Sequence, residues 1–186
     1  FIWTTYPIIL TTLFVTDRIS KGQGDPHTLT KEELLESMLL SEDDGVIDEQ
    51  ESDVIENILN LDNIKISEVL TPRSVVFALD ESMSIQEVID TQPNIFKFSR
   101  IPIYKDSFEE VTGIVLTKKI FQQALKDGTV SVGSIKKDIV SLNENIPVSK
   151  ALDMFIAKKE HMFLVIDNYD QTDGIITLED CVETIT

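Results

Sequence analysis

An internal repeat constrains the fold of this chain of 186 residues more than any other feature of its sequence. Three segments of a first copy align, in order, with three segments of a second copy: residues 80–85 with 143–148, 99–106 with 160–167, and 113–115 with 174–176. The shift falls by two residues after the first of these segments, so the first copy is two residues longer. A chain that repeats in this way is expected to fold as two similar units.

Apolar runs, turn residues and helical periodicity predict the same order of elements in each copy, namely strand, helix, strand, strand, helix. The expected elements are residues 75–79, 84–91, 101–104, 111–115 and 117–126 in the first copy, and 140–142, 147–158, 162–166, 172–176 and 178–185 in the second. This alternation predicts an α/β (α+β) fold, preceded by a short acidic helical segment.

The second copy ends in a strand-to-helix junction, Gly174 to Asp180. Thr177 and Asp180 form a capping box, so the helix is expected to begin there with free backbone N–H groups. Such an end attracts anions. The Thr177 hydroxyl can reach a phosphate, and the Asp180 carboxylate can accept hydrogen bonds from a ribose diol. The alternative interpretation is a capped junction that binds no ligand.

The first copy carries Leu116 and Lys119 at the positions of Thr177 and Asp180. Leucine cannot hydrogen-bond a phosphate and lysine cannot accept from a ribose, although Thr117 remains a candidate cap for that helix. The sequence therefore predicts one competent nucleotide site per chain, built around the second copy.

The predicted site also needs a positive charge and a platform for a base. Arg100 is the candidate for the phosphates, because a guanidinium presents a fixed fork of donors. Phe98, two residues earlier, can stack on adenine. The alternative for Arg100 is an ordinary surface salt bridge in an acid-rich protein.

Composition excludes several classes of function. A net charge of −17 argues against nucleic-acid binding, because phosphates would be repelled. The single cysteine, Cys181, excludes an internal disulfide and fits a reducing compartment. Two histidines and one cysteine do not make a typical zinc site, and no nucleophile and base set or phosphate-binding glycine loop is present. We therefore expect a protein that is not an enzyme and supplies no metal site of its own.

Between the start of the chain and the repeats lies an acidic segment. Residues 32–62 hold twelve carboxylates and no lysine or arginine. Thr30 and Glu33 form a second predicted capping box, and apolar stripes predict two helices, with Leu34, Leu35, Met38 and Leu39 on the first and Val54, Ile55, Ile58, Leu59 and Leu61 on the second. Residues 40–51 resemble a calcium-binding EF-hand loop, but the first ligand position is Leu40, so we expect no calcium site.

The first sixteen residues carry no charge. They are short and polar for a membrane span, so both a membrane-adjacent helix and a helix buried in a soluble bundle stay open. Because Phe1 is not an initiator methionine, we expect the chain to be a piece of a longer protein.

The repeat resembles a tandem pair of cystathionine β-synthase (CBS) domains. Three motifs narrow the resemblance to the CorC/CNNM family of membrane proteins linked to magnesium and cobalt efflux: residues 66–73 (ISEVLTPR), 98–104 (FSRIPIY) and 174–180 (GIITLED). The resemblance implies residues 1–31 as a membrane-proximal helical segment and loop, 32–65 as an acidic helical segment, 66–128 as the first CBS domain and 129–186 as the second.

The resemblance also implies an adenosine-nucleotide site between the two copies. Its residues would be Thr71, Phe98, Ser99, Arg100, Ile101, Gly174, Thr177, Glu179 and Asp180. Phe98 departs from the tyrosine or histidine that related sequences often carry, so no hydroxyl contact is implied there. One arginine in so acidic a chain cannot offset a triphosphate, whereas magnesium on the phosphates removes half of their charge. The expected ligand is therefore Mg–ATP, with Mg²⁺ carried by ATP.

The expected function is a regulatory module on the cytoplasmic face of the cell membrane, controlling a divalent-metal transporter through its own transmembrane domain. Two alternatives stay open: a CBS pair that regulates a soluble enzyme, and a ligand-free dimerisation module. We expect a symmetric homodimer, because Phe121, Ala124, Leu125, Val182 and Ile185 give the closing helices apolar faces.

Overall fold

The computed structural model describes residues 30–43 and 45–186. The chain divides into two compact units, Phe1–Ser52 and Asp53–Thr186. The predictions for residues 1–16 and for the loop at residues 21–26 lie outside the described residues. Within the described ranges, no helix has the length and apolar composition needed to cross a bilayer.

The acidic segment forms two capped helices, α2 (Lys31–Asp43) and α3 (Glu49–Asn60). The predicted capping box at the start of α2 is confirmed: the Thr30 amide donates to Glu33 Oε2 at 3.0 Å, and the Glu33 amide donates to Thr30 Oγ1 at 3.2 Å. Asp48 and Glu51 make the same reciprocal pair before α3. Helix α2 continues through residues 40–43, the positions at which an EF-hand loop would begin.

The apolar stripe predicted for α2 is only partly buried. Met38 is buried, whereas Leu39 is 62% exposed. On α3, Ile58 is also exposed, but Leu61 just beyond the helix is buried in the core of the second unit.

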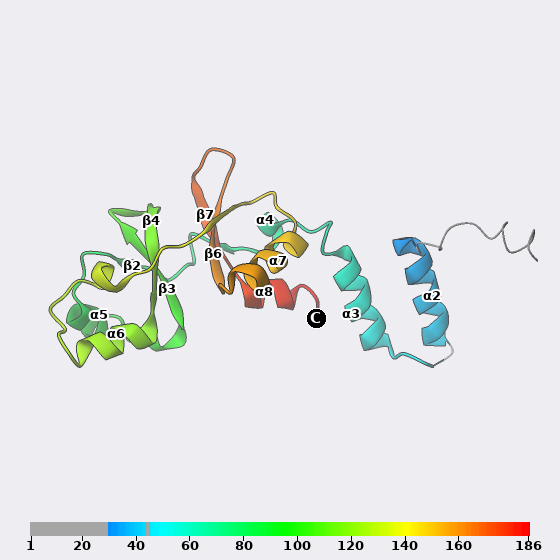
Figure 1. The fold of residues 1–186 in the computed structure, drawn as a ribbon, viewed down its shortest axis with the longest axis horizontal. Helices are drawn as coiled ribbons and strands as arrows, with labels where there is room; N and C mark the ends of the chain where they lie inside the picture. The colour runs from blue at the N-terminus through cyan, green and yellow to red at the C-terminus, as the bar shows by residue number, and fades with distance from the viewer. Residues whose placement is uncertain (1–29, 44) are drawn as a thin grey trace, which may run out of the picture. The chain divides into compact units, whose positions relative to one another are not determined.

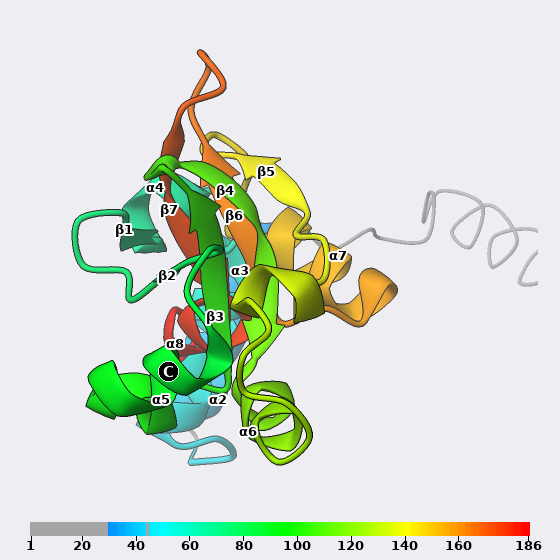
Figure 2. The same cartoon turned by 90° about the vertical axis from the view of Figure 1, so that its left-hand side faces the viewer.

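Each copy of the repeat folds as predicted, with one exception (Figure 1). The first copy contains α5 (Ile85–Thr91), the 3₁₀ turn η1 (Pro93–Lys97) and α6 (Thr117–Ala124), with strands β2 (Leu79–Asp80), β3 (Arg100–Lys105) and β4 (Ser107–Leu116). The second contains α7 (Val148–Lys158) and α8 (Leu178–Glu183), with strands β5 (Ser141–Asn143), β6 (Met162–Ile166) and β7 (Thr172–Thr177). Figures 1 and 2 show α5 and α6 beside the first sheet, and α7 and α8 beside the second.

The exception is the first strand of the first copy. Residues 75–79 were expected to be extended, but β2 contains only Leu79 and Asp80. The amide of Val75 donates to the carbonyl of Pro72 at 3.0 Å, so the chain turns here, and Val75 is 69% exposed. The apolar run therefore marks a turn followed by a short strand.

The two sheets have the same strand order. In each, the first strand of the copy runs parallel to the second, which runs antiparallel to the third: β2-β3-β4 and β5-β6-β7. The second sheet gains β1 (Thr71–Pro72), which pairs antiparallel with β7. In the first sheet, an isolated bridge between Ile114 and Lys137 takes the corresponding place.

The segment that precedes each copy in the sequence packs into the core of the other copy. The short helix α4 (Ile66–Val69) joins the core of the second copy, and η2 (Val132–Ile135) joins the core of the first. Equivalent hydrogen bonds hold both: the Ile66 amide donates to the Ile146 carbonyl, and the Val132 amide donates to the Met83 carbonyl. Residues 66–72 thus come before the first copy in sequence but complete the second in space.

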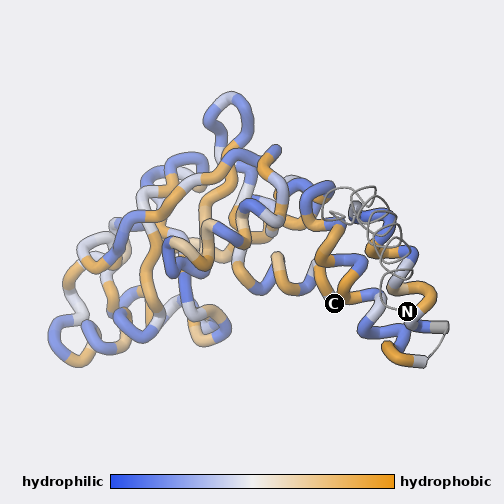
Figure 3. Tube along the Cα trace, turned by 45° about the vertical axis from the view of Figure 1, so that its right-hand side comes forward, coloured by the Kyte–Doolittle hydropathy of each residue, from blue (hydrophilic) through white to orange (hydrophobic). Residues whose placement is uncertain are grey.

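A third hydrophobic cluster lies where the two sheets meet. Its buried members are Ile114, Met162, Leu164 and Ile175. Strand β4 of the first sheet lies against β7 of the second (Figure 2). Figure 3 shows hydrophobic residues along the strands, while the hairpin loop that joins β6 to β7 is hydrophilic.

Candidate functional site

The predicted capping box at the end of β7 is confirmed in detail. The amide and the hydroxyl of Thr177 both donate to Asp180 Oδ2, at 2.7 Å and 2.8 Å, and the amide of Asp180 donates to Thr177 Oγ1 at 3.3 Å. These bonds fix both side chains at the start of α8. Because α8 has only six residues, its dipole is a weak source of positive potential.

The capping box leaves one acceptor unused. Within the described part of the chain, Asp180 Oδ1 accepts no hydrogen bond, and the side chain of Asp180 is half-buried. A carboxylate oxygen held in this way is preorganised to accept bonds from the hydroxyl groups of a ligand. Glu179, next to it, is exposed.

Thr71 and Gly174 lie side by side next to this junction. Strand β1 pairs with β7 through Thr71 with Ile175 and Pro72 with Gly174. The backbones approach so closely at Gly174 that an added Cβ would overlap the carbonyl oxygen of Thr71. Glycine is therefore required at position 174 for the packing of β1, whether or not a ligand is bound.

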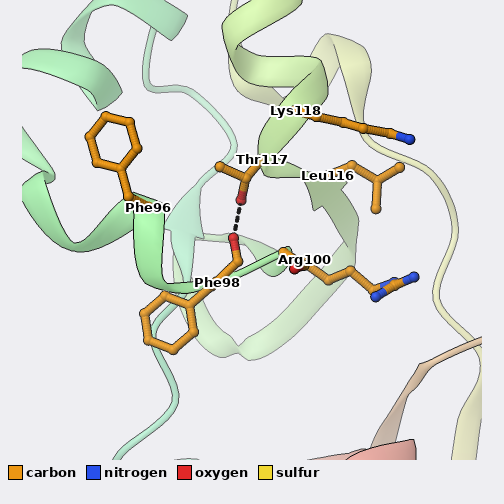
Figure 4. A pocket seen from close by; sticks show the side chains of 7 residues that line it. Phe96, Phe98, Arg100, Leu116, Thr117 and Lys118 are labelled. Atoms are coloured by element: carbon orange, nitrogen blue, oxygen red, sulfur yellow. Dashed lines mark hydrogen bonds between the residues drawn. The ribbon is translucent and has the colours of Figure 1, made fainter.

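The other predicted residues border a cavity in the first copy. Phe98, Ser99 and Arg100 precede and begin β3, and β3 pairs with the end of β4 through Arg100 and Leu116. The cavity has a volume of about 430 Å³, and its lining is Phe96, Phe98, Ser99, Arg100, Leu116, Thr117 and Lys118. Figure 4 shows the rings of Phe96 and Phe98 on one side of Thr117, and the side chains of Arg100 and Lys118 on the other.

Phe98 is supported from behind by another ring. It stacks on Phe77 with centroids 5.1 Å apart and ring planes 10° apart, and 40% of Phe98 remains exposed. One face of the Phe98 ring is thus covered by protein, and an aromatic base can reach the other. Phe96 stacks in the same manner on Phe121.

Thr117 is not a helix cap. The N-cap of α6 is Leu116, which makes no capping hydrogen bond, and the hydroxyl of Thr117 donates to the carbonyl oxygen of Phe98. The suggestion that Thr117 caps this helix is therefore wrong, and its hydroxyl instead holds the backbone at Phe98. Helix α6 therefore begins without a side-chain cap.

Two cationic side chains, Arg100 and Lys118, border this cavity. Neither Arg100 nor Lys118 forms an ion pair among the described residues. The surface salt bridge considered for Arg100 is therefore not formed within the part of the chain that the structure describes. Ile101, by contrast, is fully buried in the core of the first copy, so only its main-chain atoms remain for a ligand.

The structure thus places the predicted site residues in two groups. Phe98, Ser99 and Arg100 lie at the cavity of the first copy, while Thr71, Gly174, Thr177, Glu179 and Asp180 lie on the second sheet and at its closing helix. The lining of the cavity at Phe98 and Arg100 includes no residue of the second group. Their union in one site stays a prediction.

Sequence reasoning missed Phe77, Phe96 and Lys118. Phe77 was assigned to a strand and not to a platform, because contacts across a turn leave no periodic signal. Phe96 stands two residues before Phe98, and this spacing was the only available indication.

The environment of the lone cysteine is unreactive, since burial raises the pKa of the Cys181 thiol to about 11. The described residues contain no group of three or more acidic, histidine or cysteine side chains placed to hold a metal ion.

Comparisons with known proteins agree with this architecture. A family model for the CBS domain matches residues 132–186. A solved structure of the CBS domain of a bacterial CNNM/CorC family Mg²⁺ transporter is 27% identical, with a TM-score of 0.78, and the match covers 84% of this chain and 95% of that one. In sequence and in fold, the chain is thus similar to CBS domains of the CorC/CNNM family. The predicted resemblance to this family and the predicted α/β fold of CBS domains are therefore confirmed.

Three further relatives extend the comparison. A chloroplastic DUF21 domain-containing protein of Arabidopsis thaliana is 31% identical, over 89% of this chain and 25% of its own length. The magnesium and cobalt efflux protein CorC of Escherichia coli is 25% identical, over 87% of this chain and 55% of its own length. A solved CNNM/CorC CBS domain in complex with ATP is 27% identical with a TM-score of 0.69, over 73% of this chain and 96% of that one.

This CBS pair is thus related to proteins of magnesium and cobalt efflux. It spans between about a quarter and about half of the length of the curated relatives described above.

Proposed function

We propose that this CBS pair binds Mg–ATP and, through that binding, regulates a divalent-metal transporter from the cytoplasmic face of the cell membrane. The observation that carries the proposal is the pairing of two features: a carboxylate oxygen of Asp180 that is fixed by the capping box and unused, and a cationic, aromatic cavity at Phe98 and Arg100. The carboxylate oxygen matches the ribose of an adenosine nucleotide, and the cavity matches its adenine and phosphates. The ATP complex of a related CBS domain supports the choice of ligand.

Asp180 is assigned to the ribose. Two bonds from Thr177 hold Oδ2, so Oδ1 can accept from a ribose hydroxyl without moving the side chain. A preorganised acceptor loses little entropy on binding. The first copy has Lys119 at this position, which cannot accept a hydrogen bond, so we expect one nucleotide per chain.

Phe98 is assigned to the adenine. Its ring is backed by Phe77 and is 40% exposed, so a stacked base would cover existing apolar surface. The hydroxyl of Thr117 holds the backbone carbonyl of Phe98, which helps to fix the ring in place.

Arg100 is assigned to the phosphates. It forms no ion pair among the described residues, so binding would break no salt bridge there. The chain carries a net charge of −17, and a free triphosphate brings about four further negative charges close to it. Magnesium on the phosphates halves that charge. The balance of charge therefore favours Mg–ATP over free ATP.

Regulation follows if the bound and free states differ in shape. A ligand biases a conformation only through a difference in affinity between two states. The predicted site would join the two copies, with Phe98 and Arg100 from the first and Asp180 from the second. If the two copies closed on the nucleotide, the transmembrane part of the protein could respond to this closed conformation.

Thermal unfolding with and without ligand tests the proposal. At a ligand concentration about a hundredfold above Kd, binding stabilises the fold by ~2.7 kcal/mol. For a chain of this size the midpoint should then rise by roughly 5–10 °C. ATP with excess EDTA should give a smaller rise, and magnesium alone only a slight one.

Matched variants locate the site. Asp180→Ala should weaken ATP and adenosine alike, whereas Arg100→Ala should weaken ATP more than adenosine. Asp153→Ala and Lys158→Ala, on the exposed face of α7, remove the same charges elsewhere and should change neither. Absence of any ATP-dependent shift in the unchanged chain would favour a ligand-free dimerisation module. Two equal sites by calorimetry would contradict the assignment to the second copy.

A further inference from the structure

We propose a second ligand site in the first copy: the cavity between α6 and η2 binds a phosphomonoester dianion. The cavity has a volume of about 350 Å³, and its lining is Lys119, Gln122, Gln123, Lys126, Ser134, Ile135 and Lys136. It shares no lining residue with the cavity at Phe98 and Arg100. The proposal is independent of the proposed nucleotide site.

Three lysines line one cavity in a chain with 16 basic and 33 acidic residues. Lys136 is already neutralised, because its ammonium group donates to Glu81 Oε2 at 2.6 Å and to Thr112 Oγ1 at 2.8 Å. Lys119 and Lys126 form no ion pair within the described part of the chain. The cavity thus offers two unpaired positive charges, which match the two negative charges of a phosphomonoester.

The acidic groups next to these lysines are engaged elsewhere. The carboxylate of Asp127 accepts from the Thr129 amide at 2.9 Å and from its hydroxyl at 2.6 Å, and these bonds lower the pKa of Asp127. Glu81 is bound to Lys136, and this bond lowers its pKa. Neither carboxylate is the partner of Lys119 or Lys126, which stay available to an anion.

Polar groups around the lysines can recognise the rest of a ligand. The amide of Gln122 makes no hydrogen bond among the described residues, and Gln123 uses only Nε2, which donates to the carbonyl of Asp127 at 3.3 Å. The hydroxyl of Ser134 donates to the carbonyl of Ser131, which leaves its oxygen free to accept. The volume lies at the low end of small-molecule pockets, roughly 300–1,000 Å³, and exceeds what one phosphate fills. A phosphorylated polar molecule with hydroxyl groups fits this lining.

The second copy shows that the fold does not require these lysines. Equivalent backbone hydrogen bonds, from Ser67 to Glu144 and from Gly133 to Glu81, align α4 with η2. The positions that correspond to Lys119, Gln122, Ser134 and Lys136 in the second copy carry Asp180, Glu183, Glu68 and Leu70. One backbone therefore carries a cationic surface in the first copy and an acidic surface in the second.

Binding of glycerol 3-phosphate to the full chain, measured by calorimetry in EDTA, tests the proposal. Vesicles that contain phosphatidic acid provide a second arm, because this lipid presents the same group at a membrane surface, and phosphatidylglycerol vesicles serve as the diester control. The double variant Lys119→Glu, Lys126→Glu should raise the Kd at least about tenfold, since it reverses both unpaired charges.

The control is Lys150→Glu, Lys158→Glu, which makes the same change in net charge on exposed positions of α7 and should leave the Kd within about twofold. Arg100→Ala should also leave it unchanged, which separates this site from the nucleotide site. Circular dichroism checks that the double variants fold. Saturable binding of either probe that only the Lys119 and Lys126 variant loses supports the proposal, and the arm that binds identifies the source of the phosphate. Absence of binding in both arms, or an equal loss in the control, would overturn it.

Discussion

Glu81 in the first copy and Glu144 in the second hold the same place in the fold. The carbonyl of Glu81 accepts from the amide of Gly133 at 3.1 Å, and the carbonyl of Glu144 accepts from the amide of Ser67 at 3.0 Å. The pKa values of their side chains nevertheless shift in opposite directions. Hydrogen bonds from Lys136 and Thr112 lower the pKa of Glu81, whereas burial and then the charge of Asp173 raise the pKa of Glu144.

The difference arises at two neighbouring positions. One is Thr112, which bonds Glu81 and corresponds to Asp173, the acid beside Glu144. At the other, the residue that follows η2 is Lys136, and the residue that follows α4 is Leu70. The backbone of the repeat thus specifies where side chains lie, while their identity decides which charges are paired. The two copies differ in the same way at the start of their last helix. Thr177 and Asp180 cap α8, whereas Leu116 leaves α6 uncapped.

The largest expected effect tests what the two copies share. Gly174→Ala should lower the free energy of unfolding by about 2–3 kcal/mol, because the added Cβ meets the carbonyl oxygen of Thr71 and forces β1 away from β7. Gly113→Ala should act in the same direction, since a Cβ there meets the carbonyl oxygen of Lys137. Urea unfolding measures both. If only one of the two glycines mattered, the copies would not share this close approach.

The next prediction tests where the copies differ. Thr177→Ile should remove most of the stabilisation by Mg–ATP and cost ~1 kcal/mol without ligand, because it removes a helix cap. Thr91→Ile, at an exposed position of α5 that lines neither cavity, should leave the ligand-dependent rise in melting temperature intact. The comparison is made within each variant, with and without Mg–ATP. A full rise in Thr177→Ile would contradict the assignment of the site to the second copy.

We expect the homodimer to form through α6 and α8, the last helix of each copy. Leu125 is 90% exposed and Val182 is 45% exposed, whereas Phe121, Ala124 and Ile185 pack partly against the cores. The expected apolar faces are therefore narrower than the sequence predicted. We expect a homodimer in sedimentation, weakened by Leu125→Glu and by Val182→Glu. A monomer at all concentrations, with or without nucleotide, would rule it out.

The smallest effect concerns pH. The lowered pKa of Glu81 means that its contribution to stability is present at neutral pH and is lost as the pH falls through its folded pKa. The raised pKa of Glu144 means that stability falls as the pH rises through its folded pKa. Glu81→Gln should therefore destabilise the protein at neutral pH, and Glu144→Gln should stabilise it slightly. Melting temperatures from pH 4 to pH 8 would reveal these opposite signs, and equal signs would contradict the comparison.

The sequence predicted most of the fold because the repeat and the capping boxes are local patterns. Helices and strands after residue 84 appear near their predicted positions, and Thr177 bonds Asp180 as expected. Contacts that cross between copies were not predictable, since an alignment of repeats treats each copy as a continuous segment. The packing of residues 66–72 into the second copy is of this kind. The support of Phe98 by Phe77 lies within the first copy, but it joins two residues that no periodic pattern connects.

The site was predicted less completely than the fold. Thr177 and Asp180 form a motif within four residues, and their geometry is confirmed. The packing of α6 and η2 brings four lysines to the two cavities: Lys118, Lys119, Lys126 and Lys136. Their spacing along the chain carries no signal of this.

The route of the chain through β1 has a mechanical consequence. Tension on the residues that precede Ile66 would reach α4 and then β1, both packed on the second copy, without first passing through the first copy. Thr71 and Pro72 are bonded along the edge of β7, so a pull along this strand loads their hydrogen bonds in shear, together, and not one after another. Strand β7 ends at Thr177, three residues beyond Gly174. A displacement upstream would therefore act on the strand that carries the proposed nucleotide contacts.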